Sequence, residues 1–133
     1  MNGVEFARSL FERLDEAVYV DPVTDPTWQG DFNKCHENVD RWIALHPEDR
    51  SVRGYLVVSA TEFSALFDLH SVVERKGGPL IDVTPLRYRL RFIQCSLSDN
   101  QFEACKRYFN QLPYIIEGVG YPETSACEDD LPF

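Results

Sequence analysis

Apolar residues recur at intervals of three and four near the start of the chain, at Val4, Ala7, Leu10, Phe11, Leu14 and Val18. This spacing places them on one stripe of a helix, so we expect a packed helix there with no chemistry of its own. The following segment, DPVTDPTWQGDFN, contains Pro22, Pro26 and Gly30, which argue against regular structure. It is predicted to be a loop, and loops often carry function.

A second helix is predicted to begin near Cys35 and to run to about His46, with Asn33 or Asp31 as its cap. Pro47 marks the end, because the residue before a proline avoids the helical region. One face of this helix would carry Cys35, Val39, Trp42, Ile43 and His46. The Cys35 side chain should therefore point toward the core from the first turn.

The pattern then changes to that of strands. RGYLVVS is rich in strand-forming residues, and FDLHSVVE and PLIDVTP, separated by RKGG, are predicted to form a hairpin. PLRYRLRF alternates charged and apolar residues and should continue the sheet through Gln94, after which Ser98 or Asp99 caps a helix. The apolar face of that helix would consist of Phe102, Cys105, Tyr108 and Phe109.

This order of elements predicts an α+β fold, with helices packed on a mainly antiparallel sheet. A length of 133 residues with 44% hydrophobic residues suits one packed core, so we expect a single domain across 1–133. The tail, CEDDLPF, is expected to fray.

Charge and composition narrow the function. A net charge of -9 without a basic cluster argues against a nucleic-acid partner. Because charged residues interrupt the first twenty positions, we expect neither a signal peptide nor a membrane span, and a cytoplasmic location. The alternating Arg87, Arg89 and Arg91 are expected to form a solvated strand face, with a docking face for an acidic partner as the alternative.

The four cysteines, Cys35, Cys95, Cys105 and Cys127, lack paired C-x-x-C spacing, so reduced thiols are expected. A thiol becomes a nucleophile when a helix N-terminus and a histidine lower its pKa. His36 would point about 100° away from Cys35 on a helix, and His46 would lie roughly 16 Å along the axis. His70 remains as the partner for Cys35, while the other three cysteines are expected to be packing or tail thiols.

A hairpin centred on Gly77 would place Val72 opposite Asp82, so that His70 and Asp82 share one face as diagonal neighbours. A carboxylate there would hold the orientation and tautomer of the imidazole. Asp68 is an alternative orienting residue, ranked lower because neighbours on one strand point in parallel. A register shifted by one residue would separate His70 from Asp82.

The loop before Cys35 supplies further candidates. A glutamine there could aim its amide at a developing oxyanion beside the Cys35 backbone N-H, so Gln29 is predicted to be the oxyanion donor. Trp28 and Gly30 are predicted to be substrate-binding residues, because Gly30 would let the chain come close and Trp28 would wall a substrate cleft. Trp28 could instead tuck over the edge of the core or anchor a partner. Gln29, Cys35, His70 and Asp82 together predict a thiol amidohydrolase that forms and hydrolyses a thioester.

These residues resemble the papain-like cysteine hydrolases and, more closely, the protein N-terminal glutamine amidohydrolases. The likeness lies in Cys35-His36-Glu37-Asn38-Val39, in His70-Ser71-Val72-Val73 and in Leu80-Ile81-Asp82, within about Gln29 to Thr84. It implies a papain/transglutaminase-like core, a protein or peptide substrate, no cofactor, and deamidation of glutamine ahead of peptide cleavage or transfer to an amine.

Two other classes stay open at this stage. In a non-catalytic protein-binding module, Cys35 would be a core thiol and Trp28 an interface anchor. A metal site would use Cys35, His36 and His70, with Asp82 as a further ligand, but the short paired spacings of zinc ligands are missing, so no metal is predicted. The sequence does not specify an oligomeric state.

Overall fold

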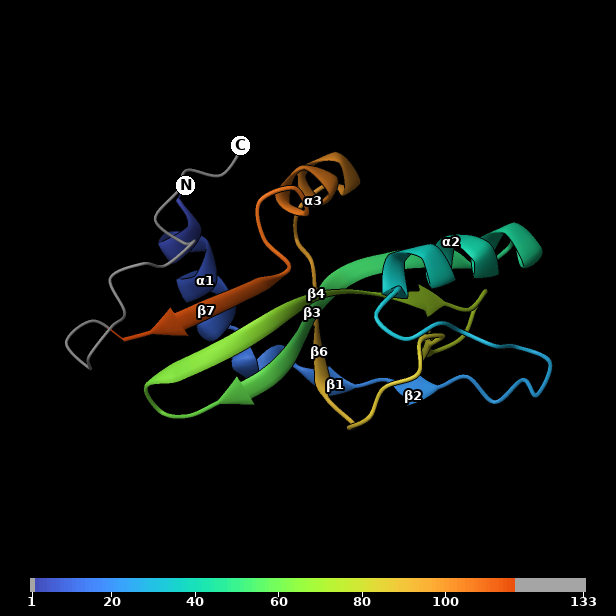
Figure 1. Cartoon of the computed structure of the whole chain (residues 1–133), viewed down its shortest axis with the longest axis horizontal. Coiled ribbons are helices and arrows are strands. Elements are labelled where there is room, and N and C mark those ends of the chain that lie inside the picture. Colours follow the sequence, from blue (N-terminus) through green and yellow to red (C-terminus); the bar gives the residue numbers. More distant parts are fainter. Residues whose placement is uncertain (1, 117–133) are drawn as a thin grey trace.

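A computed structural model describes residues 2–116 of the chain (Figure 1). The helices are α1 (Gly3–Phe11), α2 (Cys35–Leu45) and α3 (Asp99–Cys105), and a short 3-10 helix, η1, spans Leu14–Glu16. The strands are β1 (Val18–Tyr19), β2 (Asp21–Pro22), β3 (Arg50–Ala60), β4 (Ser64–Glu74), β5 (Leu80–Asp82), β6 (Arg91–Gln94) and β7 (Gln111–Ile115). The predicted α+β class is confirmed.

The long β3–β4 hairpin forms the centre of a sheet with strand order β1-β6-β3-β4-β5-β2, and β7 also pairs with β4. Every pairing is antiparallel except that of β2 with β5. In Figure 1, α2 lies along one face of this hairpin, and β6, β1 and β2 lie on the other side of it. The mainly antiparallel sheet therefore agrees with the sequence pattern.

The outer edge of β4 is shared by two strands. β7 pairs with residues 64–68 and β5 pairs with residues 73–74. Between them, none of the strands within residues 2–116 pairs with residues 69–72 on that edge, although the Leu69 N-H donates to the Asn110 carbonyl at 3.0 Å. This gap in the sheet edge positions the candidate site described below.

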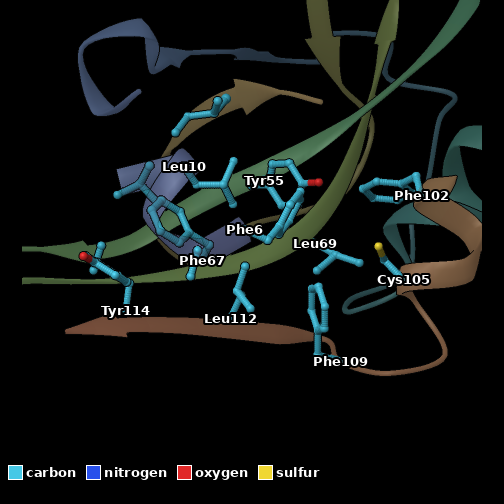
Figure 2. Close-up of a cluster of buried hydrophobic side chains, with 14 residues drawn as sticks. Phe6, Leu10, Tyr55, Phe67, Leu69, Phe102, Cys105, Phe109, Leu112 and Tyr114 are labelled. Carbon is cyan, nitrogen blue, oxygen red and sulfur yellow. The ribbon is translucent and has the colours of Figure 1, made fainter. Parts of the chain in front are cut away.

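Both faces of the central hairpin are buried. The largest cluster brings α1, α3 and β7 against the sheet and includes Phe6, Tyr55, Phe67, Phe102 and Leu112 (Figure 2). A second cluster lies beneath α2, where Val39 and Trp42 contact Val73 and Val83. A third, on the opposite face, joins Val52, Leu56, Val72 and Phe92. The strands at the centre are thus fixed from both sides, which suits a site that needs rigid walls.

The first helix is shorter than predicted. α1 begins with a capping box between Asn2 and Glu5 and ends at Phe11. The Arg13 guanidinium then donates to the Gln94 carbonyl at 2.8 Å, which holds the chain against β6. Val18, expected on the helical stripe, lies instead in β1 and is 53% exposed. The helix therefore ends before its apolar pattern does, just ahead of the contact between Arg13 and β6.

The predicted cap of α2 was wrong. Lys34 occupies the cap position without a side-chain hydrogen bond, and Asn33 adopts a positive φ of 60°. The loop is held from within the helix instead, because the Asn38 side chain accepts from the Asp31 N-H at 3.1 Å and donates to the Asp31 carbonyl at 2.8 Å. The helix itself begins at Cys35, as predicted.

The arginine strand is shorter than predicted, since β6 contains only Arg91–Gln94. Arg87 and Arg89 lie in an exposed segment, where Arg89 forms an ion pair with Asp21 at 3.0 Å. Tyr88, between them, is 76% exposed, so the expected buried face is missing there.

The third helix agrees with the sequence. Ser98 caps α3 in a capping box with Gln101, and Phe102 and Cys105 are buried. Tyr108, which follows the helix, is 54% exposed and does not join the predicted apolar face. The tail CEDDLPF lies outside the described residues.

Candidate active site

Cys35 is the first residue of α2, and its thiol lies beside the gap in the edge of β4. The sulfur is 3.9 Å from the carbonyl oxygen of Leu69. Cys35 is a free, partly buried cysteine. The N-terminus of α2 therefore brings the thiol to the gap between β5 and β7.

The predicted contact between His70 and Asp82 is confirmed. The β4–β5 register pairs Val73 with Ile81, and its continuation places Val72 opposite Asp82. His70 Nε2 lies 2.7 Å from Asp82 Oδ2, and both side chains are buried. The second carboxylate oxygen, Oδ1, accepts from the Thr84 N-H at 3.0 Å. Because Nε2 is engaged by the carboxylate, Nδ1 is the ring nitrogen left for the thiol.

The gap in the sheet explains how these groups meet. His70 lies opposite Gly54, on the face that carries Phe92, whereas α2 packs on the other face against Val73. A continuous strand beside residues 69–72 would separate the first turn of α2 from the imidazole. Because β5 and β7 diverge there, Cys35 and His70 both line one cleft.

The charges of the site favour a thiolate and an imidazolium. Burial opposes ionisation of Cys35, but hydrogen bonds with His36 and His70 outweigh it and lower the thiol pKa to about 6. Burial likewise opposes protonation of His70, and the hydrogen bonds with Asp82 and Cys35 raise its pKa to about 9. Between these two values, the pair is held as an ion pair.

His36 was missed as a partner of the thiol. The prediction used an ideal helix, which directs neighbouring side chains about 100° apart. At the start of α2, however, His36 lines the same cleft as Cys35 and contributes to the lowered pKa of the thiol, while its Nδ1 lies 2.6 Å from Ser71 Oγ on β4. The adjacent Cys35-His36 pair was the only signal in the sequence.

The shared cleft has a volume of about 540 Å³, within the range of small-ligand sites. Its walls include Asn33, Cys35, Asp68, His70 and Gln111. Burial raises the pKa of Asp68, and its Oδ1 is buried without a hydrogen-bond partner among the described residues. Asp82 is thus the carboxylate hydrogen-bonded to His70, as ranked from the sequence.

The structure does not bring Gln29 into this cleft. Gln29 is exposed and lines a neighbouring pocket with Trp28, Gly30 and Asp82. Its backbone carbonyl accepts a hydrogen bond from Arg41. The loop turns away because Asn38 holds Asp31 against the helix, so the amide of Gln29 is not placed beside the sulfur.

Trp28 covers the edge of the core, one of the roles considered for it. Its indole N-H donates to the Val83 carbonyl at 2.8 Å, and its ring packs edge-on against Trp42 at 5.1 Å. Gly30 permits this approach, because a Cβ there would overlap the Val83 carbonyl. Both residues line the pocket that contains Gln29, and both lie against Val83, the residue that follows Asp82.

The other described cysteines differ from Cys35. Cys105 is buried in the main core, and burial raises its pKa to about 11. Cys95 lies 3.3 Å from the Tyr55 hydroxyl. Cys127 lies outside the described residues.

No family model, curated protein or solved structure matches this chain. Across residues 2–116, no group of three or more His, Cys, Asp and Glu side chains is arranged to hold a metal ion. In the same part of the chain, none of the helices combines the length and apolar character needed to cross a bilayer.

Proposed function

We propose that this protein is a thiol-dependent amidohydrolase in which Cys35 is the nucleophile, His70 the acid and base, and Asp82 the residue that orients His70. One observation carries the proposal: Cys35 and His70 line the same open cleft, and the buried Asp82 is hydrogen-bonded to His70. A thiol with a pKa near 6 is nucleophilic at neutral pH, unlike an ordinary cysteine with a pKa of about 8.5.

The reaction uses both halves of the ion pair. The Cys35 thiolate attacks the amide carbonyl carbon, and the carbonyl π electrons move to the oxygen. As the tetrahedral intermediate collapses, the His70 imidazolium gives its proton to the leaving nitrogen, and a thioester remains. Water then attacks the thioester, His70 accepts a proton from that water, and the acid leaves as the thiolate of Cys35 is restored.

Glutamine amides in proteins or peptides are the proposed substrates, with ammonia as the leaving group. The choice rests on the likeness of the Cys35, His70 and Asp82 segments to the N-terminal glutamine amidohydrolases. Placement of the nucleophile on a helix that packs against antiparallel strands supports a papain/transglutaminase-like core. The same residues would serve peptide cleavage or transfer to an amine, so the substrate must be tested.

The test uses three short peptides, with glutamine at the N-terminus, with internal glutamine, and with no glutamine. Ammonia release and peptide mass are followed for the wild type, Cys35→Ser, His70→Ala and the control Cys95→Ser. We expect the wild type and Cys95→Ser to convert glutamine to glutamate, with the N-terminal position favoured, and the two site variants to lose this activity.

Three results would overturn parts of the proposal. Cleavage of peptide bonds without ammonia release would retain the thiol mechanism but reject glutamine as substrate. Full activity in Cys35→Ser would reject the thiol mechanism. Intact peptides in every reaction would favour a non-catalytic binding module.

A further inference from the structure

The tautomer of His36 is set by a buried serine. Ser71 is fully buried in β4, and its Oγ lies 2.8 Å from Arg53 Nη1 and 2.6 Å from His36 Nδ1. A guanidinium has only donors, so Ser71 Oγ accepts from Arg53. A buried hydroxyl rarely leaves its proton unpaired, and Nδ1 of His36 is the acceptor within reach among the described residues. The Ser71 hydroxyl therefore donates to His36.

The hydrogen bond from Ser71 determines which nitrogen of the neutral His36 imidazole carries the proton. If Nδ1 accepts from Ser71, the proton of the neutral ring is on Nε2. His36 and Cys35 are adjacent in the chain and line the same cleft, and His36 contributes to the lowered pKa of the thiol. Because Nδ1 is occupied, Nε2-H is the group left to face the charge that develops there.

Neighbouring elements hold this donor in place. Arg53 is anchored by Asp40 on α2 at 3.7 Å and by Glu103 on α3 at 3.4 Å. The His36 ring packs edge-on against Phe102 of α3, with 5.8 Å between the ring centres. A donor fixed before the reaction needs no reorganisation when charge develops, which is the condition for strong electrostatic stabilisation.

We propose that His36 is the anion-stabilising donor of this site, in the role that the sequence pattern assigned to Gln29. The inference rests on the proposed function, since it assumes that Cys35 attacks a carbonyl. During the attack, negative charge moves from the sulfur to the carbonyl oxygen bonded to the same carbon, so a donor beside the sulfur can follow the charge. His36 keeps its proton throughout, whereas His70 exchanges one.

Two probes separate stabilisation of the thiolate from stabilisation of the oxyanion. Iodoacetamide alkylates the sulfur without forming an oxyanion, whereas p-nitrophenyl acetate acylates it through one. Both rates at Cys35 are measured on the wild type, His36→Ala, His36→Gln, Ser71→Ala and His70→Ala. His46→Ala is the matched control, because His46 lies at the other end of α2 and stacks on Trp42. Thermal melting verifies that each variant is folded.

With iodoacetamide at about pH 5.5, we expect His36→Ala to react about tenfold more slowly, because loss of this donor raises the thiol pKa. At about pH 8, where the thiol is ionised in either protein, alkylation should be nearly unchanged, yet acylation should fall on the order of a hundredfold. His36→Gln, which keeps a neutral N-H donor, should retain most of the acylation rate. The acylation rate of Ser71→Ala should lie between those of His36→Ala and His36→Gln. This variant tests the tautomer of His36 even if His36→Ala does not fold.

Equal rates with both probes in the wild type, His36→Ala and Ser71→Ala would overturn the role of His36. An equal loss with both probes at about pH 8 would mean that His36 only supports the structure. Neither result would contradict the proposed function if His70→Ala still abolished acylation of Cys35. A wild type whose Cys35 is inert toward both probes would instead reject the proposed function itself.

Discussion

The contact between His70 and Asp82 determines which nitrogen of the imidazole can serve Cys35. In Asp82→Asn, the amide oxygen would keep the Thr84 N-H, and the amide NH₂ would then face His70 Nε2. Nε2 would have to accept, so Nδ1 would carry the proton and lose the ability to take one from the thiol. The substitution changes the tautomer with little change in shape.

We therefore predict that Asp82→Asn lowers the amide hydrolysis rate by about 10²- to 10⁴-fold. It should also move the alkaline limit of the activity profile to lower pH, because the carboxylate raises the pKa of His70. Asp68→Asn is the matched control, because Asp68 lies on the same strand as His70 and lines the same cleft, and it should lose much less activity. An equal loss in both variants would show that Asp82 has no special relation to His70.

Gly54 is the residue opposite His70 on β3, and it leaves room for Phe92 to pack against the imidazole. A Cβ at this position would overlap the Phe92 ring and the Ile93 carbonyl. We predict that Gly54→Ala lowers the free energy of unfolding by about 1–3 kcal/mol, the usual cost of overpacking. Urea denaturation measures this value.

Gly78→Ala serves as the control for Gly54→Ala. Its nearest neighbour would be Arg75 Cβ at 3.3 Å, in the exposed β4–β5 turn, so we expect a change within about 0.5 kcal/mol. A loss for Gly54→Ala no larger than that for Gly78→Ala would contradict the close packing around His70.

At the scale of elements, Asn38 joins the start of α2 to the segments on either side of it. This side chain is buried, and besides its two bonds to Asp31 it donates to Thr84 Oγ1 at 3.0 Å. It therefore connects the loop before Cys35 to the residues that follow Asp82.

We predict that Asn38→Ala costs about 1–3 kcal/mol of unfolding free energy, because buried polar groups lose their partners. It should also slow alkylation of Cys35, since the first turn of α2 is no longer anchored. Glu37→Ala, an exposed position on the same helix, should change neither property. An unchanged alkylation rate in a folded Asn38→Ala protein would show that Asn38 does not position Cys35.

The hairpin was the element that the sequence predicted best. Its register follows from symmetry about Gly77, which has a positive φ of 62°, so the sequence alone places His70 and Asp82 on one face. The start of α2 followed in the same way from local pattern. These features depend on neighbours in the chain, which is why the sequence contains them.

Features set by distant contacts were missed. Nothing local indicates that β5 and β7 diverge beside residues 69–72, that Arg13 contacts β6 just after the first helix, or that Asn38 holds the loop after Gln29. His36 was dismissed for the same reason, because its partner Ser71 is supplied by another strand. Long-range packing, rather than periodicity, completes the site.

For the whole molecule, the pKa values of Cys35 and His70 predict a pH range of activity. The thiolate forms as pH rises through about 6, and the imidazolium is lost as pH rises through about 9. Activity should therefore rise through the first value and fall through the second, as a bell-shaped profile of kcat/KM against pH. A rate that climbs steadily through about pH 8.5 would indicate an ordinary thiol.

The measurement that tests the central claim most directly is the alkylation rate of each cysteine by iodoacetamide as a function of pH, read by peptide mass spectrometry. It needs no substrate and compares the wild type with His70→Ala. Cys105, whose pKa is raised by burial to about 11, provides an internal reference.

We predict that Cys35 reacts with a midpoint near pH 6 in the wild type and loses this advantage in His70→Ala, while Cys105 stays slow in both proteins. A Cys35 with a midpoint near pH 8.5, or one indifferent to His70, would contradict the activated Cys35–His70 pair and the enzyme built on it.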